Sequence, residues 1–194
     1  DAFTHDSNAF AHRPITAGVG WGAWAPLSRT FTPPDRCAPA ESPLVCEYRL
    51  LRPSIAFIMF GTNDVGYRTL DEYRADLQSI IDTSIQMGVI PVLSTIPDRP
   101  EMPEKIARYN AVVRDLTTAQ NLPLWDYAAA LAELPNSGLT YDNLHPSAPP
   151  GKDDRSAYFL PETLRYGYTV RNLTALQMLD RIWQIIQNIP ERNL

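Results

Sequence analysis

Apolar residues form short continuous runs at three places in the middle of the chain. Residues 54–60 (SIAFIMF) lie between Pro53 and Gly61 and contain no charged residue, which is typical of a strand buried on both faces. Residues 89–96 (VIPVLSTI) and 122–125 (LPLW) predict two further strands, the last of them short.

Between and after these runs, apolar residues recur every three or four positions, which indicates amphipathic helices. The first helix is expected to begin after Thr69, a residue that can cap a helix, and to end before Gly88. The second covers 104–120, and the last runs from about Asn172 to Ile189. Their buried faces are expected at Leu70, Tyr73, Leu77, Ile80, Ile81 and Ile85, at Ile106, Tyr109, Val113 and Leu116, and at Leu176, Leu179, Trp183, Ile186 and Ile189.

The order strand, helix, strand, helix, strand predicts an α/β fold with a parallel sheet and helices on both faces. A chain of 194 residues has enough apolar material for a core, and neither a fixed repeat nor a low-complexity tract divides it. We therefore expect one domain over residues 1–194.

Charge and hydropathy exclude two classes of partner. The chain carries 17 Lys and Arg against 22 Asp and Glu, whereas nucleic-acid binders concentrate basic residues to displace counterions from phosphates. No window reaches the roughly 18 consecutive apolar residues of a membrane helix, and residues 1–13 lack the layout of a signal peptide. We expect neither a nucleic-acid partner nor a membrane span.

The two cysteines lie in a proline-rich stretch with no histidine nearby. Eight residues separate Cys37 from Cys46, which favours a small disulfide over a metal site. Because disulfides persist in oxidising compartments, we expect a secreted or cell-surface protein that uses no metal.

Two loops carry candidate chemistry. Ligands of parallel α/β sheets meet the carboxyl ends of the strands, and the first such loop contains Gly61 and Asn63, whose amide could stabilise an oxyanion. Further on, Asp142 stands three residues before His145, a separation that lets a carboxylate orient an imidazole for proton transfer. A simple turn in the first loop and a solvated histidine in the second are the alternatives.

The two loops together, GTND and DNLHP about 80 residues later, resemble the third and fifth sequence blocks of the SGNH (GDSL-type) hydrolases. The resemblance implies a flavodoxin-like three-layer sandwich, a Ser-His-Asp triad and no cofactor. It assigns His145 as general base, Asp142 as the orienting acid and Asn63 as an oxyanion donor. The glycine of the second block resembles Gly20, with Gly18 as a close rival.

One block of the resemblance is missing. No strand followed by Gly-Asp-Ser occurs, and the Asn usual in the second block is replaced by Thr16. Ser7 follows Asp6 but has no apolar strand before it, and it lies only thirteen residues before Gly20, too close for the helix and strand that should intervene. Ser7 is therefore a weak candidate for the nucleophile.

Three interpretations of the missing block remain. The chain is incomplete at its N-terminus, or a second chain supplies the strand, or the nucleophile has been lost. We prefer the first, because a sheet without its central strand would leave open edges. The predicted function is an extracellular serine esterase acting on an acyl or acetyl ester of a lipid or carbohydrate. The alternative is a non-catalytic binding or structural domain of a cell-surface assembly.

Overall fold

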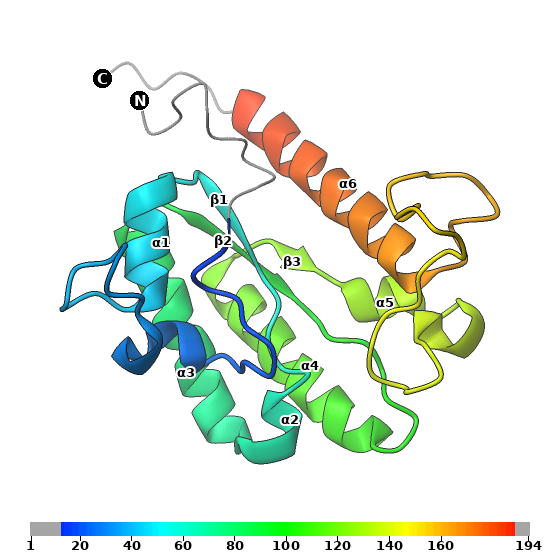
Figure 1. The fold of residues 1–194 in the computed structure, drawn as a ribbon, viewed down its shortest axis with the longest axis horizontal. Coiled ribbons are helices and arrows are strands. Elements are labelled where there is room, and N and C mark those ends of the chain that lie inside the picture. Colours follow the sequence, from blue (N-terminus) through cyan, green and yellow to red (C-terminus); the bar gives the residue numbers. More distant parts are fainter. Residues whose placement is uncertain (1–12, 189–194) are drawn as a thin grey trace.

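A computed structural model of the protein describes residues 13–188 (Figure 1). Its centre is a sheet of three parallel strands, as the sequence predicts, and their order is β1-β2-β3. The strands are β1 (Ile55–Ile58), β2 (Ile90–Ser94) and β3 (Leu124–Trp125). The register places Ile55 opposite Ile90, Ile58 opposite Leu93, Leu93 opposite Leu124 and Ser94 opposite Trp125.

Six α-helices accompany the sheet in the part of the chain that the structure describes. They are α1 (Pro43–Leu51), α2 (Asp64–Tyr67), α3 (Leu70–Gln86), α4 (Pro103–Gln120), α5 (Tyr127–Leu131) and α6 (Gly167–Gln187). Short 3-10 turns cover Ala25–Leu27, Arg29–Phe31 and Pro135–Gly138. Within the described ranges, no helix is both long and apolar enough to cross a membrane.

Helix α3 begins where the sequence predicts, because Thr69 and Glu72 form a capping box. The Thr69 hydroxyl accepts a hydrogen bond from the Glu72 N–H at 3.2 Å, and the Glu72 carboxylate accepts one from the Thr69 N–H at 2.9 Å. Two of the otherwise unpaired donors at the helix start are thereby satisfied.

One face of the sheet is covered by α1, α3 and α4, which contribute most of the buried apolar residues (Figure 1). The predicted inward residues Tyr73, Leu77, Ile80 and Ile81 of α3, and Ile106, Tyr109, Val113 and Leu116 of α4, are buried there. The prediction fails at the last turn of α3. Ile85 is 52% exposed, because it lies beside the amino ends of the strands and lines a hollow there with Ile90 and Ile185.

The opposite face carries a single long helix, α6. It begins at Gly167, five residues earlier than predicted, and packs through Val170, Met178 and Ile182 against Val92 and neighbouring residues. The inward face predicted for this helix is wrong. Its residues lie on a flank of α6 that no described element covers, and their exposed fractions are 53% for Leu176, 41% for Leu179, 58% for Trp183 and 38% for Ile186. Ile189 lies outside the described residues.

Strand β1 also departs from the prediction of burial on both faces. It pairs only with β2 among the described strands, and Phe57 is 37% exposed. Phe57 lies edge-on to Trp125 at 5.6 Å, on the face that carries α6. The strand is exposed because neither its outer edge nor this part of its face has a described neighbour.

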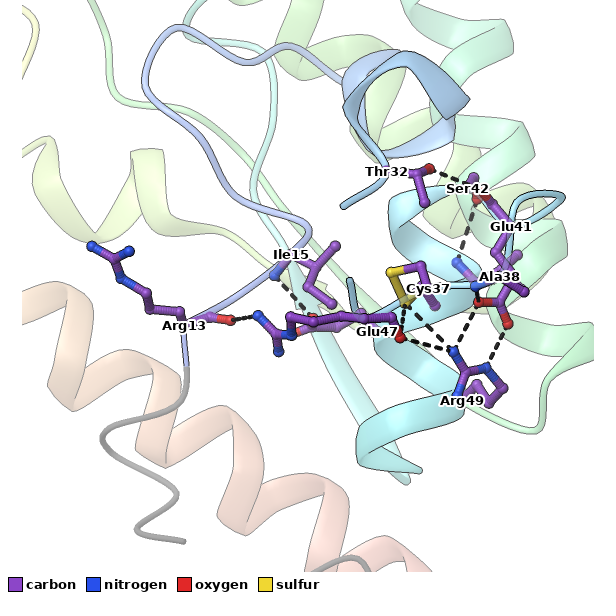
Figure 2. The surroundings of a disulfide bond; sticks show 12 residues. Arg13, Ile15, Thr32, Cys37, Ala38, Glu41, Ser42, Glu47 and Arg49 are labelled. Atoms are coloured by element: carbon purple, nitrogen blue, oxygen red, sulfur yellow. Dashed lines mark hydrogen bonds and ion pairs between the residues drawn. A yellow bond between two sulfur atoms is a disulfide. The ribbon is translucent and has the colours of Figure 1, made fainter. Parts of the chain in front are cut away.

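The expected disulfide between Cys37 and Cys46 is present (Figure 2). Only Cys37 lies in a loop, because Cys46 belongs to α1, a helix that the sequence patterns did not predict. Ile15 packs against the two cysteines, and its N–H donates to the Glu47 carboxylate at 2.9 Å. The disulfide therefore anchors the segment that starts at Arg13, whose carbonyl accepts a hydrogen bond from Arg36.

Candidate active site

The loop that follows β2 contacts both the loop that follows β1 and the loop of residues 139–147. All three lie at the carboxyl edge of the sheet (Figure 1). Arg99, after β2, donates to the Thr62 carbonyl at 3.5 Å. Two residues later, the Glu101 carboxylate accepts a hydrogen bond of 2.6 Å from the Asn143 amide. These contacts bring the neighbours of Asn63 and of His145 to the same edge.

The Asp142 and His145 side chains form the predicted hydrogen bond. His145 Nδ1 lies 2.7 Å from Asp142 Oδ2. The other carboxylate oxygen accepts from the Thr140 hydroxyl at 2.5 Å and from the N–H groups of Leu144 and His145 at 2.9 and 3.0 Å. The Thr140 hydroxyl, followed by His145, lowers the pKa of the Asp142 carboxyl well below its ordinary value. Asp142 is thus a carboxylate that can fix the orientation of the imidazole.

A tight loop holds this pair in place. The Thr140 N–H donates to the His145 carbonyl at 2.8 Å, and Leu139 forms an antiparallel bridge with Pro146. Asn143 adopts a left-handed conformation with φ of 54°, which lets the chain turn between them. The His145 side chain is 64% exposed, so its Nε2 edge is accessible to a substrate.

The Asn63 side chain joins two loops that are distant in sequence. Its Nδ2 donates to the Trp21 carbonyl at 2.9 Å, while the second N–H of that amide has no partner among the described residues. Gly20 precedes Trp21 and has φ of 77°, a conformation that favours glycine. The rival, Gly18, packs so closely on Trp21 that an added Cβ would lie 2.3 Å from the indole nitrogen. Both glycines therefore lie in the turn that Asn63 holds.

Asp64 is a positioning residue that the sequence analysis missed. Its buried carboxylate accepts hydrogen bonds of 2.9 Å from the Gly61 and Ala23 N–H groups. Burial raises the pKa of Asp64, against the effect of these two hydrogen bonds. An acid that follows Asn63 directly was the available signal, but its partner Ala23 lies 41 residues away and is invisible to a local pattern.

One cluster of potential metal ligands and one glycosylation sequon lie in the part of the chain that the structure describes. Cys37, Glu41 and Cys46 are the only cluster of potential metal ligands found between residues 13 and 188, and the two sulfurs are joined to each other. Asn172 begins a glycosylation sequon, but it lies inside α6 and its amide donates to the Ser156 carbonyl at 3.2 Å. Ser7, the weak nucleophile candidate, lies outside the described residues.

Solved structures share this fold at low sequence identity. A carbohydrate esterase family 3 protein from Talaromyces cellulolyticus has a TM-score of 0.58 at 18% identity, covering 88% of this chain and 70% of that one. A GDSL-like lipase from Bacteroides thetaiotaomicron has 0.55 at 18% identity, covering 72% and 68%. An acetylxylan esterase from Geobacillus stearothermophilus has 0.52 at 23% identity, covering 69% and 62%. The chain thus spans about two thirds of the length of these proteins.

A search of curated proteins finds no match. The GDSL-like lipase/acylhydrolase family model, in contrast, matches residues 15–149, which include Gly20, Asn63, Asp142 and His145. This range covers more than half of the chain and runs from the second-block turn to the histidine loop. The chain belongs to the GDSL-like lipase/acylhydrolase family.

Proposed function

We propose that the protein is a serine esterase in which His145 is the general base, Asp142 orients it, and Asn63 with the Gly20 N–H stabilises the oxyanion. The hydrogen bond of 2.7 Å between His145 Nδ1 and Asp142 carries this proposal. Because Nδ1 is occupied by the carboxylate, the lone pair of a neutral imidazole lies on Nε2, which is free to take a proton.

The reaction proceeds in two steps. A serine hydroxyl attacks the ester carbonyl and transfers its proton to His145, the protonated imidazole passes that proton to the leaving alcohol, and an acyl-enzyme forms. Water then attacks the acyl-enzyme, His145 takes a proton from the water and returns one to the serine, and the acid is released. During both attacks, the Asn63 amide and the Gly20 N–H donate to the negatively charged oxygen.

The serine is expected on a segment that precedes Asp1 in the intact protein. No Gly-Asp-Ser block occurs in the 194 residues, and Ser7 lacks an apolar strand before it. Such a segment would bring the serine to the carboxyl edge of the sheet, next to the loops of Asn63 and His145.

The proposed substrates are acyl or acetyl esters of carbohydrates or lipids. Structural relatives described as an acetylxylan esterase and as a carbohydrate esterase support this substrate class, as does membership of a lipase and acylhydrolase family. An extracellular location is proposed because the Cys37–Cys46 disulfide is stable in oxidising compartments.

Hydrolysis of p-nitrophenyl acetate tests the proposal. The intact protein, including the residues before Asp1, should hydrolyse the ester, and chain 1–194 alone should not. His145→Ala in the intact protein should lower kcat at least about a hundredfold, because general base catalysis is lost. Asp98→Asn is the matched control, since Asp98 is exposed and forms no described side-chain contact.

Three other outcomes contradict parts of the proposal. Activity in chain 1–194 that Ser7→Ala abolishes would make Ser7 the nucleophile. Full activity in the His145→Ala variant would remove His145 as the base. An intact protein that is folded and inactive on acetyl and longer acyl esters would favour the alternative of a binding domain.

A further inference from the structure

The guanidinium group of Arg99 is only partly satisfied. Its Nη1 donates to the Thr62 carbonyl at 3.5 Å, which is the outer limit of a hydrogen bond. Its Nε is the only buried side-chain nitrogen among the described residues that has no hydrogen-bond partner. Nη2 likewise forms no hydrogen bond or ion pair with a described residue. Buried polar groups nearly always have a partner, so an unpartnered Nε points to a group that binds there.

The same edge of the guanidinium group pairs with a carboxylate in three other arginines of this protein. Nε and Nη2 together donate to one carboxylate in the pairs Arg49 with Glu41, Arg68 with Asp76 and Arg114 with Asp126. These two N–H groups form a planar fork that matches two oxygens of a carboxylate or a phosphate. The fork of Arg99 pairs with no carboxylate among the described residues, so it is available to an anionic ligand.

Arg99 lies at the edge of the candidate active site. Thr62, whose carbonyl Arg99 binds, directly precedes the proposed oxyanion residue Asn63. Glu101, two residues after Arg99, accepts a hydrogen bond of 2.6 Å from the loop of residues 139–147, which carries the proposed base. The segment of Arg99 thus touches both loops of the site. A group bound by Arg99 would therefore belong to the molecule whose ester is attacked there.

The nearest acid does not neutralise Arg99. The Asn143 amide, followed by the Glu101 N–H and more weakly by Arg99, lowers the pKa of the Glu101 carboxyl below its ordinary value. Glu101 is therefore a carboxylate, but its oxygen bonds to Asn143 and forms no ion pair with Arg99. An anionic ligand would gain charge-assisted hydrogen bonds from the fork, whereas a neutral ligand would leave the charge of Arg99 without a partner.

We propose that Arg99 is a substrate-binding residue that recognises an anionic group, a carboxylate or a phosphate, carried by the ester close to its scissile bond. Nε and Nη2 donate to two oxygens of that group, while Nη1 holds the guanidinium against Thr62. The inference deepens the proposed function, because it names the substrate class of the same site, and it rests on that function for the hydrolysis of the ester. The substrates it selects are esters of acidic sugars or of phosphorylated alcohols.

Two matched pairs of acetyl esters test the proposal in the intact protein, with release of acetate as the measurement. Acetylated glucuronic acid is compared with acetylated glucose, and acetylated glycerol 3-phosphate with acetylated glycerol. We expect kcat/KM to be at least about tenfold higher for the anionic member of one pair. A preference within the first pair identifies a carboxylate as the recognised group, and a preference within the second identifies a phosphate.

Variants of Arg99 show whether this residue causes the preference. Arg99→Gln should raise the KM of the preferred anionic ester at least about tenfold and leave kcat/KM for p-nitrophenyl acetate within about twofold. Arg99→Lys keeps the charge but loses the fork, so it should restore only part of the preference. Arg108→Gln is the matched control, since Arg108 is exposed and forms no hydrogen bond or ion pair with a described residue.

Two kinetic outcomes would overturn the proposal. The first is equal kcat/KM for the two members of both pairs. The second is an equal loss on neutral and anionic esters in Arg99→Gln, because that result would indicate that Arg99 only supports the fold of the loops.

NMR of the Arg99 Nε–H in the intact protein separates this inference from the proposed function. Titration with glucuronate or with inorganic phosphate should shift this resonance for at least one of the two anions, and titration with glucose should leave it in place. A shift in a protein that hydrolyses no ester would keep the anion site and contradict only the proposed function. An unchanged resonance with both anions would overturn the inference, even if the protein hydrolyses esters.

Discussion

The two faces of the sheet are built from the same three strands and differ in how they are covered. On one face, α1, α3 and α4 enclose Ile58, Leu93 and their neighbours in a large buried cluster. On the other, α6 covers Val92 and Trp125 together with Tyr127 and Leu131 of the short helix α5, and Phe57 stays exposed. Because alternate residues of β1 serve both faces, the strand itself is equally apolar on each. The open face therefore carries an apolar side chain, Phe57, that no described element covers.

The largest expected effect is on the free energy of unfolding, compared between two leucine-to-alanine variants. One variant changes the covered face and the other changes the open flank. Leu77→Ala on the covered face removes a side chain that is 2% exposed and should lower the free energy of unfolding by about 3 kcal/mol. Leu179→Ala on the open flank should change the free energy of unfolding of chain 1–194 by less than about 0.5 kcal/mol. Urea unfolding measures both. Equal losses would mean that the flank is already packed.

Removal of the disulfide tests how the segment that starts at Arg13 is anchored. Cys37→Ala with Cys46→Ala should lower the free energy of unfolding by about 2 to 3 kcal/mol, because the cross-link restricts the unfolded chain. Reducing agent should destabilise the unmodified chain and leave the variant unchanged. Between the unmodified chain and the double cysteine variant, NMR chemical shifts should change near Ile15 and stay the same around Leu77. Mass spectrometry that finds two free thiols without reduction would contradict both the bond and the proposed extracellular location.

The smallest expected effect is on stability at low pH and concerns the ion pair of Arg49 with Glu41, next to the disulfide. Arg49, followed by the Ala38 N–H, lowers the pKa of Glu41 to about 2 from a model-peptide value of 4.5. A depressed pKa stabilises the fold above the unfolded pKa, so this contribution is lost as pH falls from about 4.5 through about 2. NMR titration should give a midpoint near 2, and Arg49→Gln should raise it. A midpoint near 4.5 in the unmodified chain would show that the pair does not form in solution.

Local patterns were sufficient for the strands, for α3 and α4 and for the Asp142–His145 hydrogen bond, because each depends on residues a few positions apart. They failed where the outcome depends on a distant partner. The stripe of Leu176, Leu179 and Trp183 indicates a surface to be buried, but not whether its partner is present. Asp64 was missed because one of its hydrogen-bond partners, the Ala23 N–H, comes from a different loop.

The same reasoning explains the short elements that the sequence did not predict. Helix α1 follows a proline-rich stretch and begins with Pro43 itself, which is tolerated at the first position of a helix. Its inward residues Leu44 and Tyr48 are few, so the periodicity is weak, and packing on the sheet decides its conformation.

Hydrogen exchange at β1 tests most directly the claim that the open side is completed by a strand from before Asp1. In chain 1–194 alone, the β1 amides that point away from β2 should exchange quickly, while the amides of β2, between two strands, should be slow. In the intact protein, the same β1 amides should become as slow as those of β2. Unchanged fast exchange at β1 in the intact protein would contradict the account.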